Sequence, residues 1–497
     1  MALHPRDIGK LLIGYPDGAV IFSFKHNKPT DFFQYELPQG APGGDAGANP
    51  ASQPRYPRLS QALWHPTGTF ILTTHEDSSF VVWDLKDSRV IQARTLEACN
   101  VNKPGASSQV PSSGRGIPAA KEPLFRIVWC SKANPDDTGI LIAGGMSTTA
   151  STKGLTFLDL GPTPVYATSS WQLLSDHFER PKREHVLPTP PNAEVVDFCL
   201  IPRKSPHFAG SSDPIAVIAL LASGETVTLS FPSGHPITPT NQLHVSLAFV
   251  HPFVNRIDMA YVDRTRWLGM IENRSQGPPL LKGGAEAKRS LMRYASRNVI
   301  QTAHADGTIR IWDAGHGDEI ENGRVLQVDV ARAVGRYENI DVTTMSMAGA
   351  TGELAVGLRT GEVAVFRWGK NRDFGRDIPH KEAKAFGLEA IFDRSEPSVK
   401  EGLLPFTLLD QQQHGPVTAV KMSDVGFVCA GFEDGSLTVL DLRGPAVIYS
   451  ASVTDFNSQN GKRGSFRRSN SHTQSKPEWA TSIEFAVMSL DGDGELK

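Results

Sequence analysis

The chain has 497 residues, of which 39% are hydrophobic and 21% charged, and its formal net charge is −3 at pH 7. A chain of this length can form several domains, and its near-neutral charge excludes a general attraction to nucleic acid. The 45 glycines and 35 prolines are typical of a turn-rich all-β protein.

The four cysteines are far apart and form no C-x-x-C pair: Cys99, Cys130, Cys199 and Cys429. This spacing argues against a zinc site and against a disulfide framework, and it predicts a reducing compartment. The N-terminus lacks the basic and apolar regions of a signal peptide, and no apolar run is long enough to span a bilayer. We therefore expect a soluble cytosolic protein without a metal ion or cofactor.

One pattern recurs along the chain: an apolar strand, a tight turn with Gly, and a second strand that often ends in Trp or Asp-Leu. Its copies occupy residues 11–24, 71–85, 140–160, 215–231, 299–313, 354–368 and 427–442. Asp-Gly at 17–18, 306–307 and 434–435 supplies the positive φ that hairpin turns need. Each copy is therefore predicted to be a β-hairpin.

Most hairpins follow a third predicted strand, at residues 59–68, 125–131, 195–202, 342–352 and 417–426. Repeated sheets of three or four antiparallel strands are typical of WD-repeat-like β-propeller blades. The hairpins lie farther apart than a minimal WD repeat allows, so long insertions are expected, at 38–58, 98–123, 273–292 and 369–402. Short helices are predicted within 169–180 and 380–392.

Both ends of the chain suggest a missing portion. The chain begins directly at a hairpin without a preceding strand, and it ends after a lone predicted strand at 480–488. An unpaired strand exposes open hydrogen-bonding groups. The sequence therefore predicts an internal portion of a larger protein.

The nucleotide-binding, hydrolase and metalloprotease motifs G-x-x-x-x-G-K-[ST], G-x-S-x-G and H-E-x-x-H are absent from the sequence. The chain is therefore expected not to be an enzyme. The WD dipeptides and the residues around the second of them are expected to hold blades together: Trp83, Asp84, His304, Asp306, Trp312 and Asp313.

A basic loop at 461–476 combines positive charge with serines. Its cations are Lys462, Arg463, Arg467 and Arg468, and its candidate phosphorylation sites are Ser465, Ser469 and Ser471. One interpretation is a solvated loop. The other is a contact with anionic membrane that phosphorylation weakens, because each phosphate adds about −1.5 to −2 charges.

The chain resembles the lethal giant larvae/tomosyn family, especially its fungal exocytosis members. The resemblance lies in HPRDIGKLLIGYPDGAVIFSF, in the WHPTGTFILTTHEDSSFVVWDL and VIQTAHADGTIRIWDA segments, and in KRGSFRRSNS. It implies parts of two consecutive seven-bladed propellers. Residues 1–250 would close the first propeller, 251–292 would connect the two, and 293–497 would open the second.

The resemblance also implies a scaffold in polarised exocytosis and vesicle docking, present in the cytoplasm and peripherally at the plasma membrane. Its implied partners are plasma-membrane SNAREs of the syntaxin and two-helix types and a secretory Rab GTPase, with the exocyst and a protein kinase as further partners. Stimulation of GTPase activity is implied by the resemblance alone. The alternatives are a general propeller adaptor outside membrane traffic and an enzyme that uses a central channel.

Overall fold

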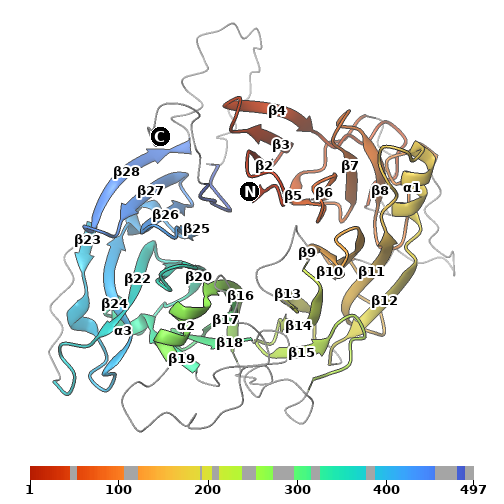
Figure 1. The fold of residues 1–497 in the computed structure, drawn as a ribbon. Helices are drawn as coiled ribbons and strands as arrows, with labels where there is room; N and C mark the ends of the chain where they lie inside the picture. Colours follow the sequence, from red (N-terminus) through yellow and green to blue (C-terminus); the bar gives the residue numbers. More distant parts are fainter. Residues whose placement is uncertain are drawn as a thin grey trace, which may run out of the picture. The chain divides into compact units, whose positions relative to one another are not determined.

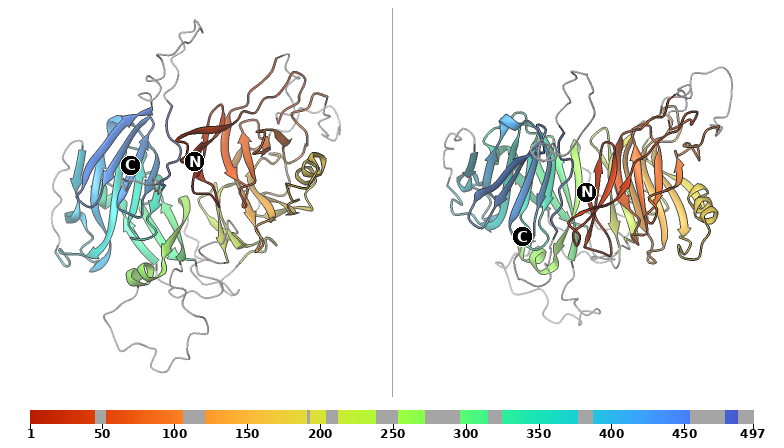
Figure 2. Two further views of the ribbon diagram at one scale, coloured as in Figure 1. Left: turned by 45° about the horizontal axis from the view of Figure 1, so that its top comes forward. Right: turned by 90° about the horizontal axis from the view of Figure 1, so that it is seen from above.

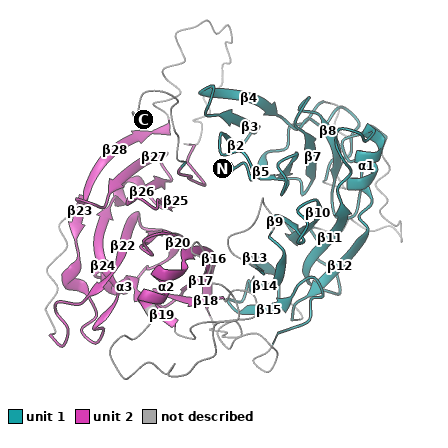
Figure 3. Ribbon diagram, in the orientation of Figure 1, with its two compact units in different colours: residues 1–241, 486–497 teal, residues 242–485 magenta. Residues whose placement is uncertain are grey.

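The computed structural model describes residues 1–44, 53–105, 121–190, 193–203, 212–237, 253–271, 296–314, 325–376, 387–453 and 478–486. The chain forms two compact units, one of residues 1–241 and 486–497 and the other of residues 242–485 (Figure 3). The strands of each unit form antiparallel sheets, so the predicted all-β class is confirmed (Figure 1).

The described residues of unit 1 form four sheets, each with its strands in sequence order. They are β1 (Ala2–Leu3), β2 (Lys10–Tyr15), β3 (Gly18–Ser23) and β4 (Lys28–Phe33); β5 (Leu59–Trp64), β6 (Phe70–His75), β7 (Phe80–Asp84) and β8 (Val90–Arg94); β9 (Leu124–Ser131), β10 (Asp137–Gly144), β11 (Gly154–Pro162) and β12 (Arg183–Pro188); and β13 (Val195–Pro202), β14 (Pro214–Leu221) and β15 (Thr226–Ser230). Helix α1 (Trp171–Glu179) lies between β11 and β12 in the sequence.

In unit 2, the part of the chain that the structure describes forms three sheets. They are β16 (Val254–Asp263), β17 (Ser296–His304), β18 (Thr308–Asp313) and β19 (Val325–Asp329); β20 (Val342–Met347), β21 (Leu354–Leu358), β22 (Glu362–Lys370), β24 (Glu401–Asp410) and β23 (Gly387–Ala390), in that spatial order; and β25 (Val417–Met422), β26 (Phe427–Phe432), β27 (Ser436–Asp441) and β28 (Ala446–Ser452). The helices are α2 (Arg264–Ile271) and α3 (Val330–Val334), with 3₁₀ turns η2 (Phe392–Arg394) and η3 (Gln412–His414).

The sheets pack face to face inside each unit, and their middle strands are buried on both faces. Strands β6 and β7 are buried along their whole length. The rings of Phe33 and Trp83, which come from neighbouring sheets, meet edge to face with their centroids 5.7 Å apart. This stacking of short meandering sheets is the arrangement of β-propeller blades, and it confirms the predicted repeat.

The predicted Asp-Gly turns adopt the required backbone conformation. Gly307 has φ of +77° and Gly435 has φ of +87°, in the left-handed region that favours glycine. The register across the first of these turns pairs Ala303 with Ile309. The structure therefore confirms the hairpins predicted at these two turns.

The five predicted third strands are present as β5, β9, β13, β20 and β25. No position was predicted for the outer strands β4, β8, β12, β19, β23, β24 and β28, and two of the strands that precede hairpins were missed. Strand β1 pairs with β2 and precedes the first hairpin, so the expectation that this hairpin lacks a preceding strand is wrong. Strand β16 pairs with β17 although residues 264–295 separate them in the sequence.

Two further predictions differ from the structure. Residues 387–390, expected within a loop helix, form strand β23, which pairs with β24. Residues 480–486 of the predicted terminal strand contain no strand. Their segment is held to β25 by a hydrogen bond from Thr418 Oγ1 to the Ala480 carbonyl (2.7 Å) and by an ion pair between Lys421 and Glu484.

Helix α1 confirms the helix predicted within 169–180. Ser170 caps its N-terminus by accepting a hydrogen bond from the Leu173 amide (3.2 Å). Arg94, at the end of β8, donates to the Glu179 carbonyl at its C-terminus (3.0 Å). The helix therefore lies beside β8 (Figure 1), and it is the yellow helix in both views of Figure 2.

The prediction of two consecutive propellers is not confirmed. The boundary between the units lies at residues 241 and 242, and the predicted connection at 251–292 contains β16 and α2. The assignment of 1–250 and 293–497 to separate propellers stays a prediction. Among the described helices, none is long and apolar enough to cross a membrane.

Candidate functional site

A chain of hydrogen bonds joins three buried side chains of the second sheet. Trp83 Nε1 donates to Thr73 Oγ1 (2.7 Å), which lies 3.0 Å from His75 Nε2. His75 Nδ1 lies 3.0 Å from the Pro57 carbonyl oxygen, which can only accept, so this nitrogen carries the proton. Burial lowers the pKa of His75, and the imidazole is neutral at pH 7.

The sheet β16–β19 of unit 2 repeats part of this arrangement. His304 Nε2 lies 2.8 Å from Thr302 Oγ1, and the Trp312 side chain is buried. Asp306 accepts hydrogen bonds from the Thr308 amide (3.0 Å) and hydroxyl (2.7 Å). Burial raises the pKa of Asp306, but these hydrogen bonds outweigh it and hold the pKa below its ordinary value.

The aspartates of the two WD dipeptides have different partners. Asp84 accepts hydrogen bonds from the amides of Lys86 (3.2 Å) and Asp87 (3.3 Å) in the following turn. Asp313 is fully buried and accepts from Arg297 Nη2 (2.9 Å) and Nε (3.2 Å). The named contacts of both aspartates lie within their own sheets. Their role as blade-holding residues stays a prediction that these contacts support.

Sequence reasoning missed Thr73, His75 and Arg297. The signal for the first two was present, because T-x-H-x-D recurs as Thr73 to Asp77 and as Thr302 to Asp306, at the same distance before each WD dipeptide. Asp77 also has the role of Asp306, since it accepts from the Ser79 amide (3.1 Å).

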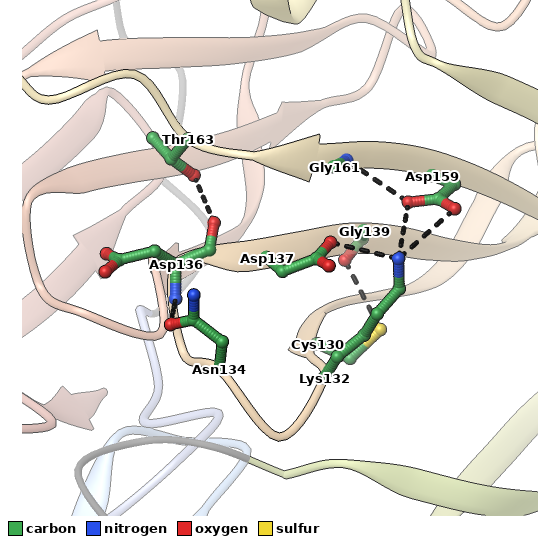
Figure 4. Close-up of polar contacts among 9 residues, drawn as sticks. All are labelled: Cys130, Lys132, Asn134, Asp136, Asp137, Gly139, Asp159, Gly161 and Thr163. Carbon is green, nitrogen blue, oxygen red and sulfur yellow. Dashed lines mark hydrogen bonds and ion pairs between the residues drawn. The ribbon is translucent and has the colours of Figure 1, made fainter.

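A polar cluster lies where the turn between β9 and β10 meets the end of β11 (Figure 4). Lys132 Nζ lies 3.0 Å from Asp137 Oδ1 and 3.4 Å from Asp159 Oδ1. Partial burial lowers the pKa of Lys132, but the two carboxylates outweigh it and raise the pKa above its ordinary value. Thr163 Oγ1 donates to the Asp136 carbonyl (2.9 Å) and fixes the turn.

The cysteine beside this cluster is unsuited to nucleophilic chemistry. Cys130 donates from Sγ to the Gly139 carbonyl (3.3 Å), as Figure 4 shows. Burial raises the pKa of its thiol to about 12, so the reactive thiolate is scarce at pH 7. In the described ranges, no group of three or more His, Cys, Asp or Glu side chains could hold a metal ion.

The predicted basic loop lies outside the described residues. This holds for Lys462, Arg463, Arg467 and Arg468 and for Ser465, Ser469 and Ser471. Membrane contact and phosphorylation at these positions therefore stay predictions from the sequence.

A family model and a curated relative that match this chain both carry the description lethal giant larvae. A family model described as "Lethal giant larvae(Lgl) like, C-terminal" matches residues 339–495. The chain is 33% identical over 504 aligned residues to Lethal(2) giant larvae protein homolog SRO77 of Saccharomyces cerevisiae, covering 99% of this chain and 47% of that protein. It is 25% identical over 494 residues to an uncharacterized protein of Schizosaccharomyces pombe, covering 99% and 46%.

The chain spans about half the length of these curated relatives. The prediction that it is a fragment lacking both ends is not borne out by these matches. Among solved structures, Sqt1 of Saccharomyces cerevisiae is similar with a TM-score of 0.46 and 9% identity, over 90% of this chain and 83% of that one.

Proposed function

We propose that this chain, which belongs to the lethal giant larvae family, is a scaffold that regulates polarised exocytosis. The observation that carries the proposal is the 33% identity to a curated family member across 99% of the chain. Because the chain spans about half of that relative, the partners of a whole family member are proposals for this chain.

The proposed partners are plasma-membrane SNAREs of the syntaxin and two-helix types and a secretory Rab GTPase. Binding would use surfaces that the blades hold in place, without making or breaking covalent bonds. The buried networks around Thr73 and Thr302 support this, because hydrogen-bonded cores hold a scaffold in one conformation. The exocyst and a protein kinase are further proposed partners.

The basic loop at 461–476 is proposed to hold the scaffold at the plasma membrane. Each basic residue near an anionic leaflet contributes about 1 kcal/mol, so its four cations contribute roughly 4 kcal/mol together. Two phosphates would cancel most of this charge. This mechanism places the protein in the cytoplasm with reversible peripheral membrane contact. Stimulation of GTPase activity is a separate proposal that rests on the family resemblance alone.

A pull-down tests the proposal. The purified chain is immobilised and offered the cytosolic domains of a syntaxin-type SNARE and a two-helix SNARE, and a secretory Rab loaded with GDP or a GTP analogue. An unrelated β-propeller on the same resin is the control for surface charge and stickiness. We expect the chain to retain at least one SNARE and the Rab above this control.

Retention of none of these proteins would contradict the proposal. Interaction proteomics on the same chain then distinguishes an exocytosis scaffold from a general propeller adaptor. Enrichment of ubiquitin-ligase or coat subunits without SNAREs would indicate a general adaptor outside membrane traffic.

A further inference from the structure

Two turns lie side by side at one end of the first sheet. Residues 4–9 join β1 to β2, and residues 24–27 join β3 to β4. The Phe24 amide donates to the Gly9 carbonyl (2.9 Å) and connects the two turns. Because neighbouring strands are antiparallel, the turn between β2 and β3 lies at the opposite end of the same sheet.

His4 fixes the shape of the first turn. Its Nε2 lies 3.1 Å from the Gly68 carbonyl oxygen, which can only accept, so Nε2 carries the proton. The unprotonated Nδ1 accepts hydrogen bonds from the amides of Arg6 (3.1 Å) and Asp7 (2.9 Å). The imidazole also meets the Trp64 ring edge to face, with the centroids 4.6 Å apart. These contacts hold the turn in one conformation before any partner binds.

The tip of this turn presents an aliphatic side chain to solvent. Ile8 is 74% accessible, more than any other large hydrophobic side chain among the described residues. Apart from its chain neighbours, a Cβ added at Gly9 would meet only the Asp7 side chain within 4 Å. The tip therefore projects from the sheet, and Ile8 is stabilised when a partner removes it from water.

Basic side chains surround Ile8. Lys10 follows it in the sequence, Lys25 lies on the second turn and Lys28 begins β4, and all three are exposed. Asp7 is the single carboxylate of the two turns. It is engaged inside the first turn, where it accepts the Gly9 amide (3.0 Å) and pairs with Lys10 (3.5 Å). Positive charge therefore dominates this end of the sheet, although the whole chain has a net charge of −3.

The opposite end of the sheet has the reverse charge. The turn between β2 and β3 contains Asp17 and no basic residue. Tyr15 beside it is 51% exposed, so this end is also accessible. The sheet is therefore polar from end to end, and a negatively charged surface would orient it with Ile8 foremost.

We propose that the end of the first sheet that carries Ile8 contacts an anionic lipid membrane, with Ile8 at the boundary between headgroups and acyl chains. An aliphatic side chain on a projecting tip needs a medium that can deform around it, and a lipid interface is such a medium. The lysines beside it are attracted to anionic headgroups. The inference rests on the proposed peripheral membrane contact, but its residues are separate from the basic loop at 461–476.

Fluorescence at single positions tests this orientation in the full chain. Ile8→Cys and Tyr15→Cys are each labelled at pH 7 with a fluorophore whose emission rises in an apolar medium. The native cysteines are buried or half-buried, and the labelled wild type supplies their background. The six-residue strand β2 separates the two positions by about 20 Å. A membrane that takes up one label therefore leaves the other in water.

Vesicles of phosphatidylcholine mixed with phosphatidylserine should raise the emission from position 8 and leave position 15 unchanged. Vesicles of phosphatidylcholine alone should change neither. In the Ile8→Cys chain, Lys25→Glu with Lys28→Glu should weaken the response to the mixed vesicles at least about tenfold. Lys370→Glu with Lys400→Glu makes the same charge change at exposed positions of unit 2 and should leave the affinity close to that of the parent. Circular dichroism confirms that each variant is folded.

Four results would overturn the proposal. The first is an equal rise in emission at positions 8 and 15, and the second is unchanged affinity in the folded Lys25→Glu, Lys28→Glu variant. The third is sedimentation of the chain with mixed vesicles without a signal from position 8, which would leave the basic loop as the membrane contact. The fourth is a response to a glutamate-rich peptide but not to vesicles, which would identify an acidic protein as the partner. The SNARE and Rab pull-down is independent of all four.

Discussion

Replacing Asp313 with alanine removes the acceptor of a buried ion pair in unit 2. Arg297 donates to Asp313 through Nη2 (2.9 Å) and Nε (3.2 Å), and the two side chains are 3% and 0% exposed. In Asp313→Ala the guanidinium loses this carboxylate while it remains buried. Removal of one partner from a buried pair costs about 3–5 kcal/mol in the free energy of unfolding.

The structure supplies a matched control in the same unit. Arg359 pairs with Asp341 at 2.5 Å, but these side chains are 67% and 39% exposed. Exposed pairs contribute about 0–1 kcal/mol, so Asp341→Ala should change the free energy of unfolding by no more than that. Urea unfolding followed by far-UV circular dichroism measures both variants against the wild type.

A double substitution separates the charge effect from packing. Arg297→Met with Asp313→Leu removes both charges and replaces them with apolar side chains, so it should recover most of the stability lost in Asp313→Ala. An Asp313→Ala variant as stable as Asp341→Ala would contradict the expected cost of breaking the buried pair. A double variant no more stable than Asp313→Ala would contradict it as well.

Thr73→Val leaves the buried Trp83 indole N–H without its acceptor and should cost about 1–3 kcal/mol in urea unfolding; an unchanged midpoint would contradict this. Burial lowers the pKa of His65 to about 3, below the 6.5 of the unfolded chain. The neutral imidazole therefore makes its full contribution to the free energy of unfolding above pH 6.5. That contribution declines by about 1.4 kcal/mol per pH unit as the pH falls from 6.5 to 3, because the unfolded chain then binds a proton that the folded chain does not. His65→Gln should reduce this decline in denaturant titrations at several pH values, and an equal slope would show that other groups cause it. Ser465→Asp with Ser469→Asp should weaken sedimentation with anionic liposomes by adding two negative charges to the basic loop, and wild-type binding would exclude the proposed switch.

The hairpins and most third strands could be predicted because their signals are local. An apolar run, a glycine turn and a second apolar run lie within a few residues, and the turn chemistry fixes their pairing. Strand β16 has no such signal, because α2 and residues 272–295 separate it from its partner β17. Strand β1 was missed because two residues are too few to show alternation.

Two segments show that tertiary contacts override local pattern. Residues 387–390 follow an amphipathic helical spacing, but they extend along β24, with Leu388 opposite Leu409. Residues 480–486 alternate like a strand, but the Ala480 carbonyl accepts its hydrogen bond from a threonine side chain. Neither partner is adjacent in the sequence, so propensity alone gave the wrong element.

The buried hydrogen bonds around the two WD dipeptides were only partly predictable, because some partners are distant in the sequence. The WD dipeptides and His304 follow a short motif that can be read directly from the sequence. Arg297 lies 16 positions before Asp313 and reaches it only through the pairing of β17 with β18. The exposure of β28 was also invisible in the sequence, because its apolar residues resemble those of a buried strand.

Isothermal titration calorimetry of the purified chain against the cytosolic domain of a syntaxin-type SNARE tests the central claim most directly. We expect saturable binding with a dissociation constant of about 10 µM or tighter, which corresponds to roughly −7 kcal/mol or more favourable. An absence of binding heat at two temperatures, for the syntaxin-type SNARE, the two-helix SNARE and the Rab alike, would contradict it.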